Sequence, residues 1–334
     1  MTVSNSPITK SLERIVCKGA PQTNPLGCGE WLSHEGYRED SGASGSQQRV
    51  KIGGLQAGFQ PAFLSQILEL FRYLLSLAKR KKGFSTLDIP RIFNISESAH
   101  RIHNPFTADK FATLGAALRL EPETRVLDLG SGSGEMLCTW ARDYRINGTG
   151  IDMSQLFTKQ AKLRAEELGV ADQVEFIHDD AAGYVADEKA GVAACVGATW
   201  IGGGVAGTIE LLAQSLHPGG IILIGEPYWL RSPPTEEIAK GCGAGAISDF
   251  LTLPELVASF DGLDYDVVEM VLANQDGWDR YEAAKWLTMR RWLETNPDDD
   301  FVKDVRARLT SEPKRYAAYT REYLGWGVFA LMAR

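Results

Sequence analysis

From residue 125 onward, the sequence alternates between short apolar segments of strand type and longer segments with helical periodicity. The strand-type segments are 125–129, 146–151, 173–177, 191–196, 220–225, 265–273 and 327–333. Helical patterns follow at 135–144, 154–168 and 205–216. This alternation predicts a parallel sheet with helices on both of its faces. We therefore expect an α/β, Rossmann-like fold with a seven-stranded, mostly parallel sheet.

The rhythm changes after the sixth strand. About fifty residues of mostly helical sequence separate residue 273 from the seventh strand, and they include Trp278, Tyr281, Trp286 and Trp292. We expect this insertion to form a helical lid at the far end of the sheet. The strand that follows it is expected to be the antiparallel one.

A glycine-rich turn follows the first strand, in the sequence VLDLGSGSGEML, residues 126–137. Its glycines, Gly130, Gly132 and Gly134, do not fit the Gly-x-Gly-x-x-Gly spacing of dinucleotide-binding turns. Glu135 stands where that pattern requires its third glycine, and Asp128 precedes the turn by two residues. Two carboxylates would repel a pyrophosphate, so the turn predicts a positively charged ligand.

The ends of the next strands carry matching residues. Asp152 ends the second strand, where a carboxylate can accept hydrogen bonds from both hydroxyls of a ribose. After the third strand, Asp179 or Asp180 can meet an adenine amino group, and we prefer Asp180 because the ring must lie beyond the strand end. Because ligands of such sheets bind at the carboxyl ends of the strands, these residues should gather at one edge.

Together these residues resemble the class I S-adenosylmethionine-dependent methyltransferases. The resemblance covers about residues 89–334 and rests on VLDLGSGSG, GTGID, HDDA and LHPGGIILIGEPYW. Within the class, the chain is most similar to bacterial small-molecule methyltransferases related to those of ubiquinone and menaquinone biosynthesis, in a branch with SESAHRIHNPF before the first strand. The resemblance implies S-adenosyl-L-methionine as cofactor. The cofactor residues expected on these grounds are Asp128, Gly130, Ser131, Gly132, Gly134, Asp152, Met153, Asp180, Ala181, Val196 and Gly197.

The methyl acceptor is expected to be a small molecule. Residues 197–200 read Gly-Ala-Thr-Trp and lack the Asn/Asp-Pro-Pro-aromatic motif that is typical of nucleobase and glutamine methyltransferases. The catalytic candidates are His103, Glu226 and Tyr228, with the histidine or the glutamate as proton acceptor. Glu226 could instead be a solvated residue at a strand end.

The predicted acceptor pocket is aromatic. Its candidate residues are Trp200, Trp229 and Tyr281. They would suit a planar or cationic molecule, although aromatic side chains at such spacing also occur in cores.

Two other functions compete with this prediction. Tyr281 and Lys285 match the Tyr-x-x-x-Lys pair of short-chain dehydrogenases, but the Thr-Gly-x-x-x-Gly-x-Gly turn of that class is missing. A protein that binds S-adenosylmethionine without catalysis would keep the glycine turn and lack an organised acceptor pocket.

The first part of the chain falls outside the resemblance. We expect residues 1–88 to form a partly disordered extension with one amphipathic helix at about 62–79. That helix, with the basic run at 79–82, could touch a membrane surface; packing on the protein or on a partner is the preferred alternative. Its apolar stretch is too short to span a bilayer, which needs about 20 residues.

Composition limits the partners and the compartment. Residues 1–90 carry 11 Lys and Arg against 7 Asp and Glu, whereas residues 91–334 carry 24 against 36. An acidic body disfavours nucleic acid as a substrate. The five scattered cysteines suggest neither disulfides nor a zinc site, so we expect no bound metal and a cytoplasmic location.

Overall fold

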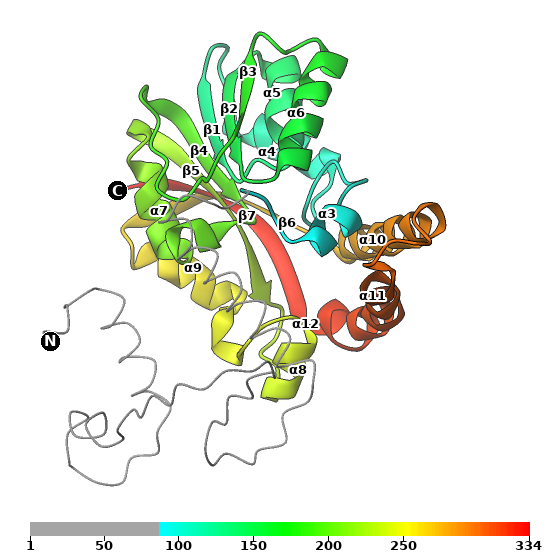
Figure 1. The fold of residues 1–334 in the computed structure, drawn as a ribbon. Helices are drawn as coiled ribbons and strands as arrows, with labels where there is room; N and C mark the ends of the chain where they lie inside the picture. Colours follow the sequence, from blue (N-terminus) through cyan, green and yellow to red (C-terminus); the bar gives the residue numbers. More distant parts are fainter. Residues whose placement is uncertain (1–86) are drawn as a thin grey trace, which may run out of the picture. The chain divides into compact units, whose positions relative to one another are not determined.

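The computed structural model describes residues 87–334 (Figure 1). The predicted helix at 62–79 and the possible membrane contact at 62–82 lie outside the described residues, as does nearly all of the extension assigned to 1–88.

The strands are β1 (Arg125–Leu129), β2 (Asn147–Asp152), β3 (Val174–His178), β4 (Ala190–Val196), β5 (Leu216–Trp229), β6 (Tyr265–Leu272) and β7 (Leu324–Ala333). The α-helices are α3 (Arg91–Ser96), α4 (Ala108–Leu118), α5 (Glu135–Tyr144), α6 (Gln155–Leu168), α7 (Val205–Ala213), α8 (Glu236–Gly241), α9 (Leu253–Asp261), α10 (Gln275–Thr295), α11 (Val302–Arg315) and α12 (Arg321–Tyr323). Shorter turns are the 3₁₀-helices η1 (Thr199–Gly202) and η2 (Ile247–Asp249) and the π-helix η3 (Tyr316–Thr320).

The strands form one seven-stranded sheet in the order β3-β2-β1-β4-β5-β7-β6. The adjacent strands β3, β2, β1, β4 and β5 pair in parallel, whereas β7 runs antiparallel to both of its neighbours, β5 and β6. The Rossmann-like fold with an antiparallel last strand is confirmed. None of the helices between residues 87 and 334 is long and apolar enough to cross a membrane.

Each face of the sheet packs on its own layer of helices (Figure 1). On one face, Val126 and Leu223 join a cluster with Trp140 of α5. On the other face, Leu127 and Ile222 join Leu212 of α7 and Phe260 of α9. The apolar runs of β1 and β5 are explained by this arrangement, because a strand covered on both faces needs apolar side chains at successive positions.

The fifth strand is longer than the predicted 220–225. The N–H of Ala190 donates to the carbonyl of Ser215, and Leu216 already pairs with β4, so the helix predicted for 205–216 ends at Ala213. At its other end, β5 stays paired with β7 as far as Trp229. The predicted bounds were wrong because partners distant in sequence, β4 and β7, set both ends of β5.

The predicted helical insertion between the last two strands is confirmed. Helices α10, α11 and α12 all lie between β6 and β7 in the sequence. Helix α10 packs against α3, where Ile92 and Ile95 meet Met289 and Leu293 in a small apolar cluster. The insertion therefore holds the segment that precedes α4, close to the carboxyl ends of the strands (Figure 1).

Candidate cofactor and active site

The glycine turn after β1 is built for close approach. Gly130 and Gly132 have φ angles of +82° and +54°, a region that side chains other than glycine seldom adopt. A Cβ atom at Gly130 would lie 2.8 Å from Ala198 Cβ, and one at Gly132 would lie 2.6 Å from His103 Cδ2. The turn can therefore pack this closely against Ala198 and His103 only because both positions are glycine.

Asp152 supports the same turn from the end of β2. Its Oδ2 accepts the N–H of Gly132 at 2.8 Å, and its Oδ1 accepts the N–H of Ser154 at 2.8 Å. Burial raises the pKa of Asp152, and these two hydrogen bonds oppose that shift. An ionised carboxylate has about four acceptor positions, so two remain for the hydroxyls of a ribose.

Asp128 lies at the end of β1, with its side chain buried. Its Oδ1 has no hydrogen-bond partner. Burial, with a smaller contribution from the charge of Asp152, raises the pKa of Asp128 to about 7. A buried carboxylate oxygen without a donor is costly, and a positively charged ligand would remove that cost.

A pocket that is partly open to solvent lies at the carboxyl ends of β1 and β4. It brings together five of the predicted cofactor residues and His103, one of the predicted catalytic residues. The lining residues in question are Asp128, Gly130, Ser131, Gly132, Val196 and His103. The order of the strands thus brings these residues together at one edge of the sheet, as the sequence predicts.

The other predicted cofactor residues are not among those that line this pocket. Met153 is buried after β2, and Gly134 begins α5. Asp180 follows β3, where its Oδ1 accepts the N–H of Ala182 at 3.0 Å. Ala181 is buried against the α7 side of the sheet, and Gly197 follows β4 with a φ of +93°.

Glu226 lies within β5, opposite Gly327 of β7. Its Oε2 accepts the hydroxyl of Thr199 at 2.7 Å, and burial raises the pKa of Glu226 to about 7. Trp200, the next residue after Thr199, is 51% exposed. Glu226 is therefore a partly buried carboxyl group whose pKa lies close to neutral pH. Groups that exchange protons with substrates often have this property.

Tyr228 and Trp229 lie deeper than the sequence predicts. Tyr228 is 3% exposed, and its ring packs where a side chain at Gly325 would stand. The indole N–H of Trp229 donates to the carbonyl of Ile247 at 2.8 Å, and its ring meets Phe250 edge-on. The structure places both in the core beneath the sheet edge, and neither lines the pocket at Asp128.

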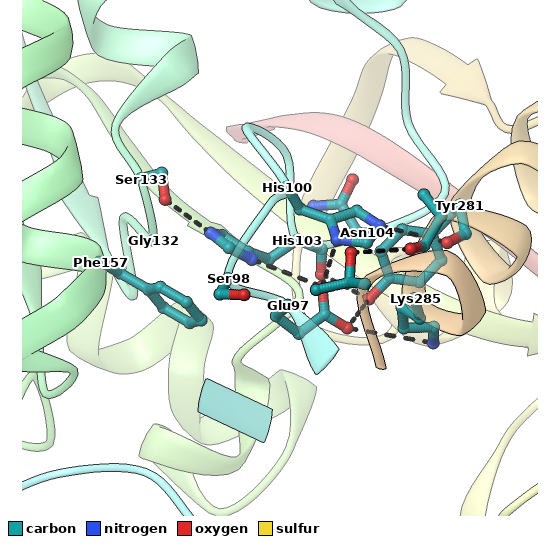
Figure 2. A network of polar contacts seen from close by, with 12 residues as sticks. Glu97, Ser98, His100, His103, Asn104, Gly132, Ser133, Phe157, Tyr281 and Lys285 are labelled. Atoms are coloured by element: carbon teal, nitrogen blue, oxygen red, sulfur yellow. Dashed lines mark hydrogen bonds and ion pairs between the residues drawn. The ribbon is translucent and has the colours of Figure 1, made fainter. Parts of the chain in front are cut away.

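His103 and Tyr281 meet in a polar network over the glycine turn (Figure 2). The ring of His103 stacks on Phe157 with 3.9 Å between centroids, and its Nε2 lies 2.8 Å from the hydroxyl of Ser133. The hydroxyl of Tyr281 lies 2.9 Å from Glu97 Oε1 and 3.2 Å from the carbonyl oxygen of His103, and its single proton is shared between these two acceptors. Tyr281 thus ties α10 to the segment that carries His103.

Sequence reasoning missed three members of this network. Glu97 lies next to both His100 and His103, while Ser133 and Gln160 bond to each other at 2.8 Å. Glu97 could have been found, because Glu97, His100 and His103 recur every three residues in SESAHRIHNPF. Gln160 belongs to an ordinary helical pattern and carries no such signal.

Between residues 87 and 334, no group of three or more His, Cys, Asp or Glu side chains is arranged to hold a metal ion. The expectation of no metal stays a prediction for the whole chain.

Comparisons with known proteins agree with this geometry. A family model described as "Methyltransferase domain" matches residues 126–220. A S-adenosylmethionine-dependent methyltransferase from Geobacter sulfurreducens, solved with S-adenosyl-L-homocysteine, is 82% identical over 74% of this chain and 100% of its own, with a TM-score of 0.74. A second one, from Thiobacillus denitrificans and also solved with S-adenosyl-L-homocysteine, is 77% identical over 74% of this chain and 100% of its own, with a TM-score of 0.73.

The Escherichia coli (strain K12) protein YjhP is 75% identical over 248 residues, which are 74% of this chain and all of that protein. These matches confirm the predicted methyltransferase class over the dehydrogenase alternative. The narrower resemblance to ubiquinone and menaquinone methyltransferases stays a prediction. The chain belongs to the S-adenosylmethionine-dependent methyltransferases.

Proposed function

We propose that this chain methylates a small molecule, with S-adenosylmethionine held in the pocket above the glycine turn. The observation that carries the proposal is the buried, unpartnered Oδ1 of Asp128 beside Gly130 and Gly132. A ligand with an ammonium and a sulfonium group satisfies that carboxylate, whereas a pyrophosphate does not. The S-adenosyl-L-homocysteine complexes of relatives 82% and 77% identical support the same ligand class.

In this proposal, different residues around the pocket contact different parts of the cofactor. Asp128 and the backbone of residues 130–132 hold the charged amino-acid part, and Asp152 accepts the ribose hydroxyls. Met153, Asp180 and Ala181 surround the adenine, with Val196 and Gly197 closing the side next to β4. When bound, S-adenosylmethionine supplies an electrophilic methyl group on a positively charged sulfur, which an acceptor atom displaces in line.

The acceptor lies on the β4–β5 side of the pocket in this proposal. Glu226 fits the role of proton acceptor, because its pKa of about 7 leaves it partly ionised at neutral pH and Thr199 holds its Oε2. His103 fits a covering role better, since its two ring nitrogens already face Ser133 and Glu97. Trp200 follows Thr199 in the sequence, and its exposed ring is available to an acceptor in this proposed site.

A small acceptor agrees with how the site is covered. The segment 97–104 crosses the glycine turn and is tied to α10 through Tyr281 (Figure 2). A site covered in this way suits a small molecule better than a nucleic-acid strand.

The test is a screen of small-molecule extracts with cofactor carrying an isotopically labelled methyl group. The wild type should transfer label to one or a few small products, and Glu226→Gln should reduce that transfer by about 10²-fold or more, as for loss of a general base. Glu255→Gln, which alters an exposed helix cap on α9, serves as the matched control. Transfer of label to nucleic acid or protein and to no small product would contradict the small-molecule acceptor.

A further inference from the structure

Three buried atoms without hydrogen bonds face one another above the cofactor pocket. They are Glu97 Oε2, His100 Nδ1 and His103 Nδ1. Each of the two nitrogens lies 3.5 Å from the same carboxylate oxygen. All three belong to the segment 97–104, so the arrangement is local to the cover of the pocket (Figure 2).

Hydrogen bonds on the far side of His103 determine which ring nitrogen carries its proton. The amide of Gln160 donates to the carbonyl of Ser98 at 2.7 Å, so its Oε1 is the end that meets Ser133. The hydroxyl of Ser133 donates its single proton to that Oε1 at 2.8 Å. Ser133 can therefore only accept from His103, and the Nε2 of His103 must carry a hydrogen.

The same reasoning applies to His100. Its Nε2 lies 3.1 Å from the carbonyl oxygen of Tyr281, which can only accept. The Nε2 of His100 therefore also carries a hydrogen. If both rings were neutral, two bare Nδ1 atoms would point at an ionised carboxylate oxygen in a buried space, which is an unfavourable arrangement.

The surrounding charges indicate where one additional proton would go. Glu97 stays ionised: burial raises its pKa, but His103, Lys285 and His100 together outweigh that and lower it. Burial lowers the pKa of His100, which disfavours an additional proton on that ring. From α10, the ammonium of Lys285 lies 3.9 Å from Glu97 Oε1 and is itself paired with Glu282 at 2.5 Å.

The remaining polar neighbours leave His103 as the acceptor of that proton. Tyr281 faces Glu97 as a neutral donor, because burial and the nearby carboxylates raise its pKa. On the opposite side, the charge of a protonated His103 opposes the rise that burial causes in the pKa of Asp152. Its ring is held by Phe157 and lies directly against Gly132.

We propose that Glu97 is a positioning residue of the methyl-donor site. It holds a second proton on His103 Nδ1, and this buried ion pair fixes the His103 ring over Gly132 so that the segment 97–104 covers the bound cofactor. The inference rests on the proposed location of the cofactor. It also assigns His103 to the cover, since an imidazole with both nitrogens protonated cannot accept a proton from the substrate.

The first measurement reads the proton directly and needs no ligand. In full-length protein labelled with ¹⁵N-histidine at pH 7, the His103 signal, identified with a His103→Asn variant, should show both ring nitrogens protonated. In Glu97→Gln, the signal should change to a neutral ring with its proton on Nε2. Glu175→Gln, an exposed residue of β3, should leave the signal unchanged.

The second measurement reads cover closure, with S-adenosyl-L-homocysteine as the probe. Stopped-flow dissociation should be at least about tenfold faster in Glu97→Gln than in the wild type, as expected when one partner of a buried charge pair is removed. Tyr281→Phe, which removes the tie to both Glu97 and His103, should act in the same direction. Thermal unfolding establishes that each variant is folded.

The outcomes are distinct. A neutral His103 in the wild type, or unchanged dissociation from folded Glu97→Gln and Tyr281→Phe, overturns the positioning role. Failure of the wild type to bind S-adenosyl-L-homocysteine at all overturns the proposed function instead, and the NMR result still tests the ion pair.

Discussion

At the scale of single residues, the negative charge of Asp128 favours binding of a cationic ligand but lowers the stability of the protein without that ligand. Its pKa rises from 3.8 to about 7 on folding because of burial and the charge of Asp152. The unfolded chain therefore releases this proton first, and the free energy of unfolding falls as pH rises from about 4 to 7. The charge that attracts the cofactor is thus unfavourable in the protein without ligand.

The variant Asp128→Asn should separate these two effects. At pH 8 it should increase the free energy of unfolding by about 2–4 kcal/mol, and the gain should disappear near pH 4, where the wild-type carboxyl is neutral. Urea unfolding of both proteins between pH 4 and pH 8 measures this difference, with the exposed Asp172→Asn as control. An equal effect at both pH values would show that the charge of Asp128 is not the cause.

The same variant should bind S-adenosylmethionine more weakly. In the wild type, affinity should increase as pH rises through about 7, because the cationic ligand favours the ionised carboxylate. Asp128→Asn should lose most of this increase. Calorimetric titrations at pH 6 and pH 8 check it, and a wild-type affinity independent of pH would argue against contact between Asp128 and the ligand charge.

At the scale of elements, Gly134 lets α5 begin against its neighbours. Its φ is +71°, and a Cβ there would lie 2.5 Å from the Phe176 ring of β3 and 2.8 Å from Ala161 Cβ of α6. Gly169, at the end of α6, has a similar φ of +67° with nothing within 4 Å of a Cβ. The two glycines thus differ in packing while sharing a left-handed backbone conformation, which glycine adopts without strain.

This pair makes a matched test by chemical unfolding. Gly169→Ala should cost about 1 kcal/mol of unfolding free energy from strain alone, whereas Gly134→Ala should cost about 2–4 kcal/mol because the ring and the methyl group must also move. Equal costs for the two substitutions would mean that α5 does not depend on this close approach.

At the scale of the whole molecule, the order of the strands and helices could be predicted from the sequence, whereas the burial of the candidate site residues could not. The order of strands and helices follows from periodicity, and the turn after β1 follows from its glycines and Asp128. The burial of Tyr228 and Trp229 depends on β7, which pairs with β5 from about a hundred residues away. The Glu97 network likewise needs α10 beside α3, a contact that no local pattern encodes.

Charge distribution also acts on the whole molecule. With 24 Lys and Arg against 36 Asp and Glu in residues 91–334, the body should repel nucleic acid. Fluorescence anisotropy with a labelled DNA duplex should therefore show no binding at protein concentrations up to about 10 μM in physiological salt. Salt-dependent binding in that range would contradict the expected absence of a nucleic-acid partner.

The most direct test of the account is a calorimetric titration of the full chain with S-adenosylmethionine, S-adenosyl-L-homocysteine and NAD. Both adenosyl ligands should bind at one site, and folded Asp152→Ala should bind them about 10–100-fold more weakly, since charge-assisted hydrogen bonds to the ribose are lost. NAD should release no heat of binding. Tight binding of NAD, or adenosyl-ligand affinities unaffected by Asp152→Ala, would contradict the claim that the carboxylates around the glycine turn select a positively charged methyl donor.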